Sequence, residues 1–286
     1  NPCKYLTTRG YEVTFLPVDR YGLVDLNRLG KELTDKTILV SIMYANGEVG
    51  TIEPIEEVSR IVHKRNAYLH VDATAANGQI AIDVRKEGID LLTLSSNDMY
   101  GPKGMGALYV KDGVRIEPIL HGGGQERGLR SGTENLPSIV GFGKAAEINK
   151  KEMEKESKQL TALRDKLIKG LLEAAPYAYL NGHPTRRLPN NVSVRYSFIE
   201  GESMLLSLDM LGVSASSGSA CTAKTLEPSH VLLAVGLKHE EAHGSLLFTL
   251  GRQNTEDEVD YVISIMPNIV KRLRKMSPLT PKELKE

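Results

Sequence analysis

The setting of Cys221 favours nucleophilic or metal-binding chemistry. The residue lies in Ser-Ser-Gly-Ser-Ala-Cys-Thr, residues 216–222, with Lys224 just behind it. Small polar neighbours suit an exposed thiol, and a nearby positive charge favours the thiolate, the form that attacks and binds metals. A lone cysteine is commonly a small buried hydrophobe, but polar residues on both sides argue against burial here. Cys3 has no motif around it.

A second stretch has the composition of an oxyanion site. Residues 121–124 read His-Gly-Gly-Gly, and residues 130–133 read Arg-Ser-Gly-Thr, ending at Thr133. Glycine-rich loops with hydroxyl groups can cradle a phosphate through backbone N–H groups. Glycine-rich turns are more often only turns, so this signal is weak when taken alone.

The first half of the chain alternates strand-like and helix-like segments. Apolar, β-branched runs predict strands at residues 37–43, 68–72, 91–94 and 105–110, and apolar spacing predicts a helix over 55–62. Strands that are apolar on both sides and joined by helices favour a mainly parallel sheet covered on both faces. Functional groups gather beyond the carboxyl ends of such strands, where Asn46, Asp72 and Ser95 lie.

Two of these strand-end residues also have ordinary structural explanations. Asp72 has the residue type of a helix N-cap. Asn46 precedes a glycine, and Asn-Gly is a strong turn signal. Local sequence does not separate these roles from ligand binding.

The pattern of the second half of the chain predicts a long helix over residues 136–175, which Pro176 ends. It then predicts a strand at 191–196, a helix from Gly201 to near Gly212, and a last helix over 256–275. The charged stretch 150–158 marks the expected boundary between a large domain, residues 1–153, and a smaller α+β domain, residues 154–286, that carries Cys221.

Composition narrows the function classes. The chain has 286 residues, 41% of them apolar, with 36 basic and 36 acidic side chains. Neutral net charge argues against a dedicated nucleic-acid surface, and no apolar run is long enough to span a membrane.

Two cysteines favour a reducing cytoplasm over a disulfide framework. The chain opens on Asn1 rather than Met, which suggests the remainder of a longer protein.

In their order along the chain, the motifs resemble cysteine desulfurases of the IscS/NifS type, which are class-V aminotransferase-like enzymes that use pyridoxal phosphate (PLP). The resemblance covers nearly the whole chain and is carried by residues 45–50, 70–74, 95–104, 121–133, 216–230 and 242–252. It implies an α/β, aspartate aminotransferase type I fold. It also implies a transferase that converts L-cysteine to L-alanine and holds the sulfur as a persulfide on Cys221.

The resemblance assigns roles to particular residues. Asp72 would pair with the PLP ring nitrogen, Asn46 would contact the ring oxygen or the substrate, and Ser95 and Thr133 would hold the phosphate. Thr133 would reach across from the second subunit of a homodimer. The expected partner is a U-type iron–sulfur scaffold protein, which receives the sulfur.

The sequence departs from the family at four positions. Asp98 stands where a lysine bonds covalently to PLP, and Asn97 replaces the preceding histidine. Ala75 replaces a glutamine that contacts the ring, and Leu247 replaces the arginine that grips the substrate carboxylate. The resemblance also implies roughly a hundred further residues before Asn1.

Three functions follow from this pattern. The preferred one is a cysteine desulfurase-like protein of iron–sulfur cluster assembly, which handles sulfur through Cys221 and has weak or absent activity on L-cysteine because of Asp98. PLP would then be non-covalent or absent, and Cys221 would be a candidate ligand of a shared [2Fe-2S] cluster. The alternatives are a functional PLP-dependent cysteine desulfurase and a decayed, inactive paralogue.

Overall fold

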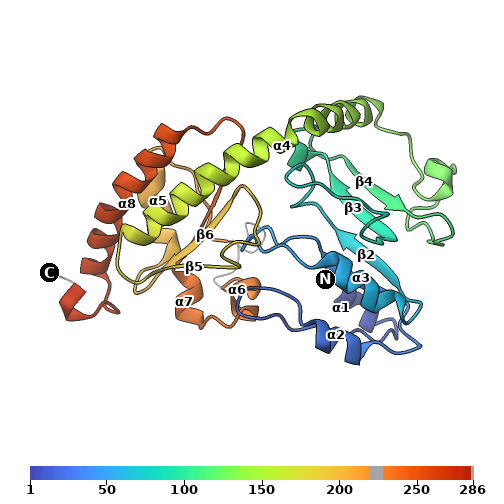
Figure 1. Ribbon diagram of the computed structural model, residues 1–286, viewed down its shortest axis with the longest axis horizontal. Helices are drawn as coiled ribbons and strands as arrows, with labels where there is room; N and C mark the ends of the chain where they lie inside the picture. Colours follow the sequence, from blue (N-terminus) through green and yellow to red (C-terminus); the bar gives the residue numbers. More distant parts are fainter. Residues whose placement is uncertain (219–227, 285–286) are drawn as a thin grey trace.

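The computed structural model describes residues 1–218 and 228–284, and the long helix α4 extends along both of its β-sheets (Figure 1). The first half of the chain forms a four-stranded sheet with helices on one side. The second half forms a three-stranded sheet with helices around it.

The first sheet has the order β1-β2-β3-β4. Strands β1 (Leu39–Met43), β2 (Tyr68–Asp72) and β3 (Leu91–Ser95) are parallel, and β4 (Gly106–Val110) is antiparallel to β3. Helices α2 (Leu26–Glu32) and α3 (Ile55–His63) pack on this sheet through a buried apolar cluster. These elements confirm the strands and the α3 helix predicted from the sequence.

One face of this sheet is only partly covered. Its side chains include Leu39, Met43, Tyr68 and Leu108, which are 43–48% exposed. The same sheet carries a hydrogen-bonded chain in which His70 Nδ1 lies 2.8 Å from Ser41 Oγ and His70 Nε2 lies 2.8 Å from Thr93 Oγ1. The expectation that both faces are covered is therefore wrong for the residues that the structure describes. Apolar patterning shows what a strand can bury but not what packs on it.

Helix α4 (Leu136–Glu173) begins at Asn135, whose side chain accepts the Ser138 N–H, and has proline in its first turn. Its leucines at the predicted helical spacing are buried against α8, β5 and β6. The expected domain boundary near residue 153 falls inside this helix, so the division at 153 stays a prediction.

The second sheet is antiparallel, in the order β5-β6-β7. It consists of β5 (Ala178–Leu180), β6 (Asn191–Tyr196) and β7 (Ser245–Thr249). Helices α5 (Gly201–Asp209) and α8 (Glu256–Met276) share its apolar core, while α6 (His230–Ala234) and α7 (His239–His243) are short. The remaining helices in the described part of the chain are α1 (Pro2–Thr7), η1 (Asn97–Met99), η2 (Glu126–Gly128) and η4 (Lys282–Leu284).

No helix among residues 1–218 and 228–284 is long and apolar enough to cross a membrane.

Candidate functional site

The carboxyl ends of β1, β2 and β3 meet at one edge of the first sheet. The Tyr44 N–H donates to the Asp72 carbonyl at 2.7 Å, and the Ala73 N–H donates to the Thr93 carbonyl at 3.0 Å. The backbone ladder therefore continues just past the strands. As predicted, Asp72 and Ser95 are the last residues of β2 and β3, and Asn46 follows β1 by three residues.

The carboxylate of Asp72 is half-buried, and one of its oxygens forms a local turn. Oδ1 accepts the Thr74 N–H at 3.0 Å. Within the described residues, no hydrogen bond engages Oδ2. Asp72 thus organises its own turn and keeps an acceptor oxygen at the sheet edge.

The side chain of Asn46 forms the turn that the Asn-Gly pair predicts. Its Oδ1 accepts the N–H of Glu48 at 2.9 Å and of Val49 at 3.0 Å. The amide nitrogen is not used in this turn and remains a donor. The turn and ligand-binding roles of Asn46 are thus compatible. Gly47 lies against Ala75, whose methyl group would be 3.5 Å from a Cβ added at Gly47.

The loop after β3 is fixed by Asn77. This buried side chain accepts the Ser95 N–H at 2.8 Å and donates to the Ser95 carbonyl at 3.0 Å. Beyond it, the η1 turn presents Asn97 and Asp98 to solvent. The exposure of Asp98 is typical of a loop acid in contact with water. The position at which the family has a lysine therefore carries a carboxylate and no amine.

Tyr100 and Arg252 hold this loop against the second half of the chain. The Arg252 guanidinium stacks on the Tyr100 ring, 4.1 Å from its centroid, and the Tyr100 hydroxyl accepts the Arg252 N–H at 3.0 Å. Glu156 on α4 completes the contact, because it accepts the Tyr100 hydroxyl at 2.9 Å and pairs with Arg252 at 3.0 Å. The loop is therefore well anchored although its lysine is absent.

The other predicted site residues are more scattered. Leu247 lies in the middle of β7, and its N–H donates to the Ser216 carbonyl at 2.6 Å. Thr133 is exposed, and no hydrogen bond among the described residues joins it to Asp72, Asn46 or Ser95. Cys221 lies outside the described residues. The structure thus places Asn46, Asp72, Ala75 and Ser95 at one edge of the sheet, and none of the hydrogen bonds between described residues links Thr133 to them.

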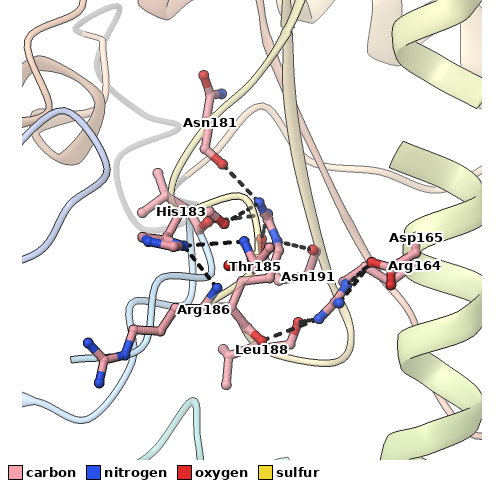
Figure 2. A network of polar contacts seen from close by, with 10 residues as sticks. Arg164, Asp165, Asn181, His183, Thr185, Arg186, Leu188 and Asn191 are labelled. Carbon is pink, nitrogen blue, oxygen red and sulfur yellow. Dashed lines mark hydrogen bonds and ion pairs between the residues drawn. The ribbon is translucent and has the colours of Figure 1, made fainter. Parts of the chain in front are cut away.

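A buried network that sequence reasoning missed holds the Asn46 turn against the second half of the chain. Figure 2 shows part of this network, with Asn181, His183 and Asn191 labelled. The Arg187 guanidinium donates to the carbonyls of Asn191, Asn181 and His183, each at 3.2 Å, and to the Val49 carbonyl at 3.3 Å. The Asn191 amide donates to the Gly47 carbonyl at 2.9 Å.

Nothing in the local sequence marks Arg187 for this role. It is 3% exposed, whereas its neighbour Arg186 is exposed. Burial, aided by the nearby Arg164 charge, lowers the pKa of Arg187 to about 10. The group stays a cation at neutral pH, and its hydrogen bonds go to peptide carbonyls and to Asn191 Oδ1, at 2.8 Å, rather than to a buried carboxylate.

Comparisons with known proteins show which family has this architecture. A family model described as Aminotransferase class-V matches residues 1–262. Cysteine desulfurase IscS 1 of Archaeoglobus fulgidus is 61% identical over 279 residues, which are 98% of this chain and 72% of that protein. The chain belongs to the cysteine desulfurase family. A second family member, cysteine desulfurase IscS of Methanosarcina thermophila, is 55% identical and is covered over 69% of its length.

Solved structures of cysteine desulfurase relatives share the fold. A NifS-like protein superposes with a TM-score of 0.86 at 40% identity, covering 94% of this chain and 71% of that one. A NifS-like protein of Rickettsia africae gives a TM-score of 0.85 at 30% identity, covering 93% of this chain and 72% of that one. The predicted PLP-dependent type I transferase fold is confirmed.

The residues of this cysteine desulfurase relative fit PLP in part. Asp72 Oδ2 and the Asn46 amide nitrogen, which form no hydrogen bond within residues 1–218 and 228–284, are the acceptor and donor that a protonated ring nitrogen and a ring oxygen need. Ser95 supplies a hydroxyl at the same sheet edge. The covalent anchor does not fit, because the Asp98 carboxylate cannot replace a lysine amine.

Proposed function

We propose that this cysteine desulfurase relative handles sulfur for iron–sulfur cluster assembly through Cys221, and that its activity on L-cysteine is weak or absent. The observation that carries the proposal is the anchored loop after β3, which presents the exposed carboxylate of Asp98 where the family has a lysine. Leu247 adds a second loss, since an apolar side chain cannot grip a carboxylate.

Asp72, Asn46, Ser95 and Thr133 are the residues that would hold PLP. When bound, PLP supplies an electron sink for reactions at the amino acid α-carbon. Asp72 would keep the ring nitrogen protonated, and Asn46 would orient the ring from its turn. Thr133 would serve this pocket from the second subunit of a homodimer, a role that needs the exposed side chain it has in the single chain.

The partner proposed for Cys221 is a U-type scaffold protein. In this account the thiol carries a persulfide to the scaffold or acts as a thiolate ligand of a nascent [2Fe-2S] cluster. The relatives named IscS support this placement.

A functional PLP-dependent desulfurase is the second candidate. It is favoured by the retained strand-end geometry, in which Asp72 and Asn46 each keep a polar atom that no other described residue engages. A decayed paralogue is disfavoured by the closed core around β6, α4 and α8, which a chain free of selection would not need to keep.

Sulfur acceptance by Cys221 tests the proposal without PLP. The chain is incubated with cysteine persulfide, so that the Cys221 thiolate attacks the outer sulfur, the S–S bond of the donor breaks, and the donor thiolate leaves. We expect one added sulfur atom on the Cys221 peptide by mass spectrometry, and its transfer to a U-type scaffold as acid-labile sulfide when iron and a thiol reductant are supplied.

Two cysteine variants control this experiment. Cys3→Ser should behave like the unmodified chain, because Cys3 lies in the first helix with no motif around it. Cys221→Ser should lose labelling and transfer completely while still binding the scaffold. Equal labelling of Cys3 and Cys221, or unchanged transfer by Cys221→Ser, would refute the proposed role.

A further inference from the structure

The short helix α7 carries two histidines that the roles assigned so far do not use. Residues 239–243 read His-Glu-Glu-Ala-His, so His239 and His243 are four residues apart. Side chains at this spacing lie on the same face of a helix, one turn apart. The same spacing presents two zinc ligands on one helix face in zinc metalloproteases. The pair is therefore a candidate for metal binding.

The two imidazole rings lie close enough to share one metal ion. Their centroids are 4.8 Å apart, and their planes are tilted by 55°. Two imidazoles that bind one zinc ion at N–Zn distances of about 2.0–2.1 Å have ring centroids about 4.5–5.2 Å apart. Both side chains are exposed, and exposed side chains change rotamer readily. One nitrogen of each ring can thus turn towards the same ion while the backbone stays in place.

Neither ring takes part in the polar contacts that hold the fold together. Within residues 1–218 and 228–284, the rings of His239 and His243 contact each other and form no hydrogen bond. His63 is different, because its Nε2 lies 2.8 Å from Asp90 Oδ2. A metal ion at the α7 pair would therefore break no hydrogen bond among the described residues.

The backbone of α7 is fixed to the rest of the protein. The Glu241 carboxylate accepts the Lys238 N–H at 3.0 Å at the start of the helix. Ala242 is 3% exposed and belongs to a small apolar cluster with Val49 and Leu232. The two histidines are thus presented from an anchored turn, which lowers the conformational cost of binding a ligand.

We propose that His239 and His243 form a two-histidine site for a divalent transition metal ion. Imidazole nitrogen suits zinc, copper, iron and nickel. Among the described residues, no group of three or more histidine, cysteine, aspartate or glutamate side chains could hold a metal ion. The remaining coordination positions therefore belong to water or to a donor from another molecule. The site uses neither PLP nor Cys221, so it does not rest on the proposed function.

A simple contact between two aromatic rings is the competing explanation for this pair. Tilted ring pairs are stabilising by themselves and need no metal ion. A ring contact alone predicts that the pair binds zinc no better than a single exposed histidine, such as His121. A shared ion predicts much tighter binding, because the first ligand raises the effective concentration of the second.

The experiment is isothermal titration of Zn²⁺ into the full chain carrying Cys3→Ser and Cys221→Ser, which removes the two thiols that would compete for zinc. We expect one tight site on each chain. His239→Gln and His243→Gln should each weaken zinc binding about 10²-fold, because each variant leaves a single imidazole. Both positions are exposed, and circular dichroism would verify that the variants keep the fold.

Two further variants of the same chain control for histidine content. His121→Gln removes an exposed histidine elsewhere and should leave the zinc affinity unchanged. Lys238→His combined with His239→Gln keeps the number of histidines but separates the pair by five residues, about 140° around the helix, and should not restore the affinity. The proposal is overturned if both single variants in α7 bind zinc as tightly as their parent, if His121→Gln weakens binding as much as they do, or if the shifted pair restores it.

Discussion

Replacing Arg187 by alanine is expected to lower the free energy of unfolding by about 3–5 kcal/mol. The guanidinium donates to four carbonyl groups, one of which, Val49, lies 138 positions away in the chain. Without it these buried acceptors lose their partners, and the Asn46 turn loses its link to the second sheet. Urea unfolding followed by circular dichroism measures the change.

Arg186→Ala is the matched control for this prediction. Its side chain is exposed, and exposed substitutions of this kind usually change stability by less than about 0.5 kcal/mol. A loss below about 1 kcal/mol for Arg187→Ala would show that the network in Figure 2 contributes little to the fold.

The second large effect concerns PLP retention. Asp98→Lys should allow the chain to keep PLP through gel filtration, whereas the unmodified chain should lose it. The physical reason is that the loop after β3 is already anchored by Asn77, Tyr100 and Arg252, so a lysine at position 98 would extend its amine from an ordered turn. Borohydride reduction followed by peptide mapping would locate the covalent label at position 98.

Asn97→Lys controls for a general gain of basic charge. It adds an amine to the same η1 turn, but one residue earlier and about 120° around it. This variant should release PLP. Equal retention by both variants, or none by Asp98→Lys, would argue that the pocket beside Asp72 is no longer formed.

Some elements of this fold were predictable because their side chains are buried in simple patterns. The leucines at 160, 163, 167 and 171 recur at helical spacing, and all four are buried in α4. The β-branched runs of β1 to β3 likewise predicted a parallel sheet, and with it the strand ends at which Asp72 and Ser95 lie.

The remaining features depend on residues far apart in the chain. Arg186 and Arg187 are indistinguishable by local pattern, and only the fold shows that one of them is buried among carbonyl groups from several segments. Glu48 looks like an ordinary turn residue, and only the fold shows that it is buried, at 8% exposure. The Asn46 example is intermediate, because the sequence predicted the turn but not that the turn engages Oδ1 and leaves the amide nitrogen unused.

The most direct test of the central claim is alanine formation from L-cysteine, with PLP added, by the unmodified chain and by Asp98→Lys. The account predicts that the unmodified chain forms alanine at least about 10³-fold more slowly than an enzyme with its covalent catalyst, with no multiple turnover. Alanine formation over many turnovers by the unmodified chain would contradict the account, because the chain would then be a working desulfurase without its lysine.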